Sequence, residues 1–186
     1  MQELSLNILD IAENSVKAGA ALITVAVEYR TARDRLTVTI ADNGCGMSAE
    51  TLQKVTDPFY TTRTTRRVGM GLPLWKMAAE MTGGTLAVQS REGVGTTVTA
   101  TFGLSHIDRL PLGDLPQTMT TLVGGSPEKD FVLEFDYDGR RFTADTRQYR
   151  TVLGEEIPLS APEVLSYIDS AIREGIAECC PDPGVL

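Results

Sequence analysis

Hydrophobic residues recur along the chain with two periods, one typical of helices and one typical of strands. Residues 3–18 fit an amphipathic helix, because their apolar and polar positions form two opposite arcs at about 100° per residue. One arc contains Leu4, Ile8, Ile11, Ala12 and Ser15, and the other contains Asn7, Asp10, Asn14 and Lys17 with Glu13 at its flank. Residues 21–29 and 35–41 alternate apolar and polar side chains, which predicts two strands that each bury one face.

Further elements follow in an order that defines the fold class. The pattern predicts a helix at 49–55, a loop at 57–71, a helix at 72–81 and strands at 85–89 and 96–102. Because the alternation in the strands is one-sided, the helices are expected to cover one face of the sheet. We therefore predict an α+β fold, in the form of a two-layer α/β sandwich with a mixed sheet.

The composition changes after residue 104, and we divide the chain there. Residues 1–104 form the first expected domain. Residues 105–129 contain several prolines and a Gly-Gly pair, which predicts a connector with one short strand at 118–123. Residues 130–186 are expected to form a small α+β appendage. Because the roughly 80 residues after 104 have few large apolar side chains, we expect this part of the chain to pack on the first domain or on a partner.

Two local signals define the appendage. Asp138 and Gly139 separate two alternating segments and form the strongest short-range hairpin signal. Ser160 and Glu163 match a capping box, with a proline in the first turn, at the start of a helix that runs to about Cys179. The predicted appendage is therefore a hairpin followed by a helix.

The chain is acidic, and its formal net charge of −8 argues against nucleic acid or an anionic membrane as the main partner. No apolar run approaches the roughly 20 residues that cross a bilayer, and the N-terminus has no signal pattern. We therefore expect a cytoplasmic protein. The three cysteines, Cys45, Cys179 and Cys180, form no disulfide framework, and the adjacent pair is interpreted as inert thiols rather than a metal site.

Four separated parts of the chain combine residue types suited to nucleotide binding. They are the helix segment 10–17 (Asp-Ile-Ala-Glu-Asn-Ser-Val-Lys), the turn 42–46 (Asp-Asn-Gly-Cys-Gly), the loop 57–63 (Asp-Pro-Phe-Tyr-Thr-Thr-Arg), and 69–71 (Gly-Met-Gly) together with 95–97 (Gly-Thr-Thr). Each part alone has an ordinary interpretation, as a solvated helix face, a turn or a mobile loop. Their order and spacing argue against a chance combination.

Three of these segments carry groups that can bind the adenine or the phosphates of ATP. The Asp42 carboxylate can accept a hydrogen bond from the exocyclic amine of adenine, and the alternate glycines after it let the backbone approach the base. The side chains of Arg63, Arg66 and Arg67 can pair with phosphate oxygens. Glycine N–H groups that run into a helix N-terminus form a site for an anion.

Together these segments resemble the ATP site of the GHKL superfamily, which includes gyrase B, Hsp90, histidine kinases and MutL and has the Bergerat fold. The resemblance covers roughly residues 1–104 and implies ATP and Mg²⁺ as ligands. The loop and the glycine segment are most similar to histidine kinases, whereas residues 13–20 are most similar to MutL-type ATPases. Where the family usually has a further glycine, this chain has Arg67. Nothing is recognised from Ser105 onward.

The resemblance implies roles for the polar arc of the first helix. Asn14 would bind Mg²⁺ through its side-chain oxygen, which suits the preference of this ion for oxygen ligands. Lys17 would reach a phosphate and is a catalytic candidate. Asp10 stands where hydrolysing members carry a catalytic Glu, so its carboxylate could orient or deprotonate a nucleophile, and Glu13 is a further candidate. The candidate nucleotide-binding residues are Asn14, Lys17, Asp42, Gly44, Gly46, Met47, Phe59, Thr62, Arg63, Gly69, Met70, Gly71, Leu72 and Thr96.

Three functions remain open for such a domain. In the first, ATP donates its γ-phosphoryl group to a Ser, Thr or His of a regulatory partner protein. Histidine kinases carry an acceptor histidine upstream, whereas this chain begins at the expected ATPase helix and has one histidine, His106, in the connector, so the acceptor is expected on another chain. In the second, Asp10 activates water, and hydrolysis switches a homodimer or a partner. In the third, the domain only binds nucleotide. We rank partner phosphorylation first because the loop resembles that of kinases.

Overall fold

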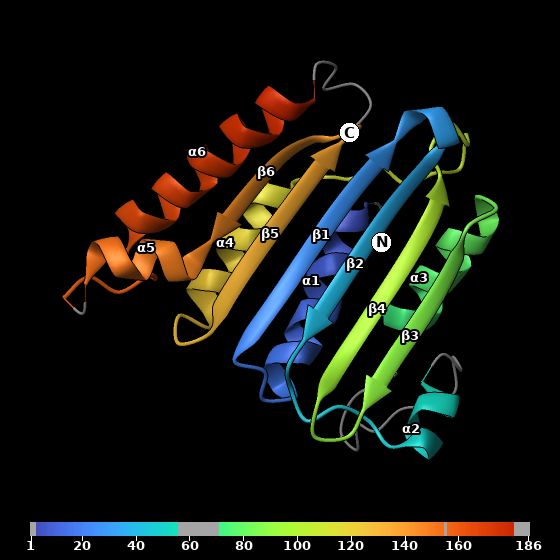
Figure 1. The fold of residues 1–186 in the computed structure, drawn as a ribbon, viewed down its shortest axis with the longest axis horizontal. Coiled ribbons are helices and arrows are strands. Elements are labelled where there is room, and N and C mark those ends of the chain that lie inside the picture. The colour runs from blue at the N-terminus through green and yellow to red at the C-terminus, as the bar shows by residue number, and fades with distance from the viewer. Residues whose placement is uncertain (1–2, 56–70, 155, 181–186) are drawn as a thin grey trace.

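The computed structural model describes residues 3–55, 71–154 and 156–180, which form a mixed β-sheet with helices packed against it (Figure 1). The strands are β1 (Leu22–Arg30), β2 (Arg35–Asp42), β3 (Thr85–Arg91), β4 (Gly95–Gly103), β5 (Asp130–Tyr137) and β6 (Arg140–Asp145). The helices are α1 (Leu4–Lys17), α2 (Ala49–Lys54), α3 (Gly71–Met81), α4 (Leu115–Gly125), α5 (Thr146–Leu153) and α6 (Pro162–Cys179), with a 3₁₀ turn at Thr31–Arg33. The strand order is β3-β4-β2-β1-β5-β6, in which β1 is antiparallel to β2 and parallel to β5. The predicted α+β fold with a mixed sheet is confirmed.

Helix α1 is the central helix of the layer behind the sheet in Figure 1, with α3 on one side and α4 on the other. Its apolar arc packs against β1 and β2, where alternate residues such as Val25 and Val38 are fully buried. All members of the predicted apolar arc are buried, which confirms that prediction. Asn7, which we assigned to the polar arc, is also buried, and its amide donates to the Glu3 carbonyl oxygen at 3.4 Å. The buried arc is wider than predicted because helices pack on both sides of α1.

The connector contains a helix where a strand was predicted, so the prediction for residues 118–123 is wrong. The Asp114 carboxylate accepts a hydrogen bond from the Gln117 backbone N–H at 3.0 Å, and Pro116 lies in the first turn. Both features favour the start of a helix. The buried apolar residues of α4 recur with a helical period: Leu115, Met119, Leu122 and Val123. Because α4 contacts both α1 and α6, packing outweighs the strand-like composition of this segment.

The C-terminal segment extends the sheet of the first domain. The predicted hairpin is confirmed as β5 and β6, with Asp138 and Gly139 at φ values of 50° and 92° in the turn. Every residue of β5 pairs in parallel with β1. Among the described residues after 104, β5 pairs with β1 and α4 packs against α1, which confirms for these residues the expectation of packing on the first part of the chain. Helix α5, which follows β6 directly, was not predicted.

Helix α6 packs against α4 and the edge strand β6. The predicted capping box does not form, because the N-cap is Ala161 and no side chain caps the helix. A turn is closed by the bond from the Ala161 N–H to the Pro158 carbonyl oxygen at 3.0 Å, which leaves Ser160 ahead of the first helical turn. Among the described residues, no helix combines the length and the apolar character that a bilayer span requires.

Cys179 and Cys180, at the end of α6, are both buried, and neither forms a disulfide. Burial raises the pKa of the Cys179 thiol, and a protonated thiol is a poor nucleophile and a poor metal ligand. The described part of the chain also contains no group of three side chains that could hold a metal ion. The raised pKa of Cys179 is what the interpretation of this thiol as inert requires.

An ion-pair network joins the two hairpins at one end of the sheet. Arg30, at the end of β1, donates to both carboxylate oxygens of Asp136 on β5, at 2.5 and 3.0 Å. The same carboxylate accepts from Arg141 Nε at 2.9 Å and from the Gly139 N–H at 2.8 Å. The bond from Arg30, together with these donors, holds the pKa of Asp136 well below its usual range. The network therefore stabilises the parallel pairing of β1 with β5.

The first prediction concerns Asp136. Because the folded-state pKa of Asp136 is depressed, its stabilising contribution is complete above the unfolded-state pKa of about 4 and is lost as the pH falls below that value. We expect Asp136→Asn to lower the free energy of unfolding by about 1 kcal/mol at pH 7. Urea unfolding monitored by circular dichroism should show this difference shrinking below about pH 4.

The matched control is Glu134→Gln. Glu134 lies on the same strand and the same face of the sheet, where it is exposed. This variant should be as stable as the parent chain at both pH values. Equal destabilisation by the two substitutions would contradict the role assigned to the network.

Candidate functional site

A cavity of about 720 Å³ opens between α1, the segment that follows β2, the start of α3 and the start of β4. This volume is within the usual range for pockets that hold a small-molecule ligand, roughly 300–1,000 Å³. Eight of the predicted site residues line it: Asn14, Lys17, Asp42, Gly46, Met47, Gly71, Leu72 and Thr96. The structure thus brings together residues from three of the four segments that the sequence singled out.

The remaining predicted residues lie elsewhere. Phe59, Thr62, Arg63, Gly69 and Met70 are outside the described residues. Three described residues, Gly44, Asp10 and Glu13, are not among those that line the cavity. Gly44 donates to Asp42, Asp10 contacts Gly71, and Glu13 forms an ion pair with Lys17.

Asp42, at the end of β2, is held by hydrogen bonds to both of its carboxylate oxygens. Its Oδ1 accepts from the Gly44 N–H at 2.9 Å and from the Thr96 N–H at 3.3 Å. Its Oδ2 accepts from the Ser15 hydroxyl at 2.6 Å. Donors from the turn, from β4 and from α1 therefore fix the plane of one carboxylate at the cavity wall.

The turn after Asp42 is held against its neighbours by backbone bonds. The Cys45 N–H donates to the Ala18 carbonyl oxygen at 2.9 Å, at the end of α1. Gly46 has a φ of 66°, and a Cβ at this position would overlap the Arg91 carbonyl oxygen. The Met47 N–H then donates to Ser90 Oγ at 2.8 Å. Gly46 is therefore required both by its left-handed conformation and by the close approach of β3.

Asp10 lies beside the start of α3. A Cβ on Gly71, the first residue of α3, would overlap Asp10 Oδ2, so the carboxylate is in direct contact with that residue. A carboxylate at a helix N-terminus is favourable because it faces the positive end of the helix dipole. The contact joins α1 to α3.

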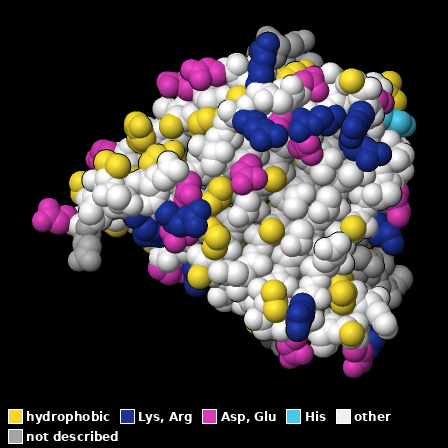
Figure 2. Space-filling model, viewed as in Figure 1, with side chains coloured by type: hydrophobic (Ala, Val, Ile, Leu, Met, Phe, Trp, Pro, Cys, Tyr) yellow, Lys and Arg dark blue, Asp and Glu magenta, His cyan; other side chains and the backbone are white. Residues whose placement is uncertain are grey.

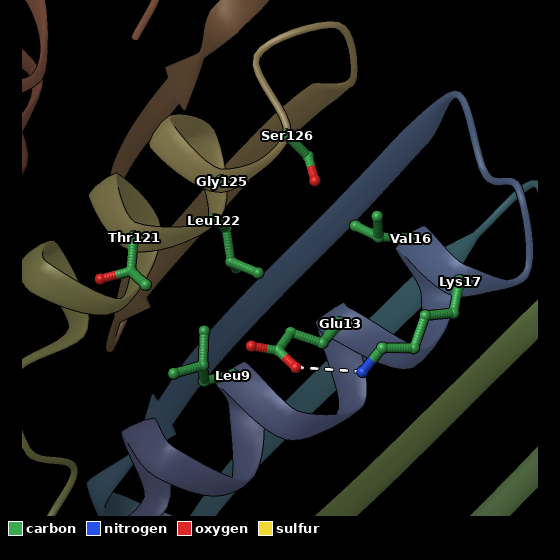
Figure 3. Close-up of a pocket in the computed structure, with 8 residues that line it drawn as sticks. All are labelled: Leu9, Glu13, Val16, Lys17, Thr121, Leu122, Gly125 and Ser126. Atoms are coloured by element: carbon green, nitrogen blue, oxygen red, sulfur yellow. Dashed lines mark hydrogen bonds and ion pairs between the residues drawn. The ribbon is translucent and has the colours of Figure 1, made fainter. Parts of the chain in front are cut away.

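Glu13 faces a second, smaller cavity of about 200 Å³ between α1 and α4. Figure 3 shows its carboxylate in an ion pair with Lys17, at an Nζ–Oε2 distance of 3.1 Å. Lys17 borders both cavities. Because both side chains of this pair are about half exposed (57% and 49%), the pair contributes little to stability, and Lys17 can exchange Glu13 for another anion at small cost.

The donor set of the cavity suits a magnesium ion that is held mainly by the nucleotide. Mg²⁺ usually keeps several waters and takes one or two protein oxygens together with phosphate oxygens. Asn14, whose side chain includes an amide oxygen, is one of the residues that line the cavity. One protein oxygen, from Asn14, is consistent with this pattern.

Several cavity residues were not predicted from the sequence. They are Ile11, Ser15, Ala18, Cys45, Ser48, Thr51, Val55, Glu92 and Val98. Most are apolar or small residues that the sequence pattern could only assign to a core or a turn. Ser15 was assigned to the buried arc, which is correct, since it is 4% exposed. Its contact with Asp42 joins residues 27 positions apart, so no local pattern could indicate it.

Comparison with known proteins identifies the family. The family model described as histidine kinase-, DNA gyrase B-, and HSP90-like ATPase matches residues 1–106, more than half of the chain. The chain belongs to this family. The predicted GHKL resemblance is thereby confirmed, and the chain carries a histidine-kinase-like ATP-binding domain.

Two relatives illustrate the similarity of this ATPase domain to sensor proteins. The heme sensor protein HssS of Staphylococcus saprophyticus is 37% identical over 93 residues, which cover 44% of this chain and 20% of that protein. The sensor histidine kinase ZraS of Salmonella typhimurium is 30% identical over 93 residues, which cover 50% of this chain and 20% of that protein. The chain thus spans about a fifth of the length of these relatives.

A solved structure, the N-terminal domain of a DNA repair protein, shares the fold of this chain. The TM-score is 0.51 at 14% sequence identity, over 77% of this chain and 52% of that one. At this identity the likeness concerns the fold alone. It extends beyond residues 1–106, the part matched by the family model.

The second prediction separates the two constraints on Gly46. We expect Gly46→Ala to lower the free energy of unfolding by at least about 3 kcal/mol, because it adds both conformational strain and overlap with the Arg91 carbonyl. Gly93→Ala is the matched control, since Gly93 has a φ of 73° and no atom near its missing Cβ. Its cost should be about 1 kcal/mol, from strain alone. Equal losses in thermal or urea unfolding would contradict the steric argument.

Proposed function

We propose that this protein binds ATP together with Mg²⁺ and transfers the γ-phosphoryl group to a side chain of a separate regulatory protein. The observation that carries the proposal is the Asp42 carboxylate, which is hydrogen-bonded through both oxygens at the wall of a cavity large enough for a nucleotide. A cytoplasmic location, where ATP and such partners meet, is part of the same proposal.

Adenine recognition is assigned to the Asp42 end of the cavity. A carboxylate is an acceptor only, so it pairs with the exocyclic amine of adenine and repels the oxo group that guanine carries at the same position. Val98 and Ile11, which line this cavity, provide apolar surface for a base. The turn at Gly46 lets the backbone approach without a side chain in between.

The triphosphate is assigned to the end of α1. Asn14 and Lys17 are one turn apart on α1 and both line the cavity. Asn14 would hold Mg²⁺, which neutralises phosphate charge when bound. Lys17 would leave Glu13 and pair with a phosphate oxygen, an exchange that the half-exposed ion pair allows.

Transfer to a partner is favoured over hydrolysis by the positions of the two candidate bases. Asp10 contacts Gly71 and Glu13 faces the smaller cavity, so neither lines the nucleotide cavity. A partner histidine with an unprotonated ring nitrogen already has a lone pair, so a histidine acceptor requires no such base in the cavity wall. In this step the bond from the γ-phosphorus to the bridging oxygen breaks, ADP leaves, the phosphorus bonds to a Ser or Thr oxygen or a His nitrogen of the partner, and the displaced proton passes to water.

We propose that the three parts of the chain have different roles. Residues 1–104 would bind the nucleotide, residues 105–129 would connect, and residues 130–186 would offer the surface for a partner or for a second copy in a homodimer. The pairing of β5 with β1 supports a direct connection between these parts.

The third prediction tests the adenine site. We expect Asp42→Asn to weaken binding of Mg-ATP by roughly 10- to 100-fold, because a charged acceptor is lost. Binding can be followed by calorimetry or by the fluorescence of Trp75, the single tryptophan of the chain, which lies in α3 one turn from Gly71. Asp108→Asn, at an exposed position, is the control and should bind normally. Unchanged affinity for Asp42→Asn would exclude this carboxylate as the adenine acceptor.

The fourth prediction distinguishes transfer from hydrolysis. With γ-labelled ATP and a protein that co-purifies with the chain, we expect label on that protein. Asn14→Ala should lower the transfer rate by roughly 100-fold or more, the scale for loss of transition-state charge stabilisation. Asp10→Asn and Glu13→Gln should transfer at rates similar to the parent chain. If Asp10→Asn instead keeps nucleotide affinity and loses phosphate release, hydrolysis with Asp10 as base is the function.

A further inference from the structure

Ser15 lies where the hydrophobic core meets the nucleotide cavity. Its side chain is 4% exposed, and it belongs to the face of α1 that packs on the sheet. It nevertheless lines the cavity of about 720 Å³ together with Asp42 and Val98. A polar side chain at such a boundary needs a hydrogen-bond partner, and the identity of that partner determines what the hydroxyl can do.

The hydroxyl proton of Ser15 points to Asp42. Ser15 Oγ lies 2.6 Å from Asp42 Oδ2 and 3.4 Å from the Ile11 carbonyl oxygen. A hydroxyl has one proton, and a distance of roughly 2.5–2.7 Å is typical of a bond from a hydroxyl to a carboxylate. Ser15 is therefore the donor to Asp42, and the contact with Ile11 is at most a weak one.

Ser15 also differs in kind from the other donors to Asp42. The bonds from the Gly44 and Thr96 N–H groups both reach Oδ1 and belong to the backbone. Ser15 instead donates from its side chain, and its bond reaches Oδ2. Two donors on one oxygen leave the carboxylate free to tilt about that oxygen, whereas a third donor on the other oxygen prevents the tilt.

We infer that Ser15 is a positioning residue for base selection: by donating to Asp42 Oδ2, it holds the carboxylate so that the remaining lone pair on that oxygen faces the base. This inference rests on the proposed binding of ATP. Because the Ser15 proton is committed to Asp42, both side chains present only acceptors to the cavity. Such a surface selects a purine that carries an amine at position 6.

The test compares two nucleotides on the full chain. Mg-ATP carries the 6-amine, and Mg-purine riboside triphosphate has hydrogen at that position and is otherwise the same. We expect Ser15→Ala to weaken ATP binding roughly tenfold and to change binding of the analogue by less than about twofold. The ratio of the two affinities therefore falls, which a general loosening of the cavity would not produce.

Three further variants serve as controls. Ser15→Thr retains the hydroxyl and should keep the ratio within about threefold of the parent chain. Ser15→Cys is close in size but a weak donor, so it should lower the ratio as Ser15→Ala does, and it replaces Ser15→Ala if that variant does not fold. Ser5→Ala changes an equally buried serine of the same helix, about 15 Å away along its axis, and should alter neither affinity.

The outcomes separate the inference from the proposed function. If Ser15→Ala or Ser15→Cys lowers both affinities equally, or leaves the ratio unchanged, Ser15 does not position Asp42 and the inference is wrong. If the parent chain binds neither nucleotide, the proposed function itself fails. If the parent chain binds both equally well, the base is not selected at position 6 and the inference is overturned while nucleotide binding stands.

Discussion

The structure depends on the burial of one face of α1 against β1 and β2. Leu4, Ile8 and Ile11 fill the space between helix and sheet, which fixes the rotation of α1 about its axis. Once this rotation is fixed, Asn14 and Lys17 face the side of the helix that borders the cavity, because side chains three or four residues apart share a face. The same packing brings Ser15 within hydrogen-bond distance of Asp42 at the end of β2. The position of the site is therefore a direct result of the core.

Strand β1 extends this constraint to the C-terminal half. It pairs with β2 on one side and with β5 on the other, so residues from both halves share one sheet. Helix α4 covers the junction, since it contacts α1, β5 and α6. The network of Arg30 and Asp136 connects the same two strands at their far ends. Figure 2 shows the face of the sheet that α1, α3 and α4 do not cover. Few charged side chains lie over its central strands, and Lys and Arg side chains gather at one end of it.

The segment between the two halves illustrates how local signals compete. Residues 118–123 (Thr-Met-Thr-Thr-Leu-Val) have a composition typical of strands, and the sequence alone favoured one. Two contacts decide for a helix: Asp114 caps its first turn, and its apolar residues are buried against α1 and α6. At Ser160 the opposite occurs, because a local capping signal is present but a backbone turn places the residue outside the helix. Tertiary packing overrides the propensity at residues 118–123, whereas at Ser160 one local signal overrides another.

The sequence by itself determined the elements of residues 1–104 that lie in the described part of the chain, the hairpin at Asp138 and Gly139, and the polar residues from which the cavity is built. These follow from local periodicity and turn chemistry, which act over a few residues. Only the tertiary structure decided that β5 joins β1, that Asp10 contacts Gly71 rather than the cavity, and that Ser15 donates to Asp42. Each of these is a contact between residues far apart in the chain, and such contacts exist only after the apolar faces have packed together.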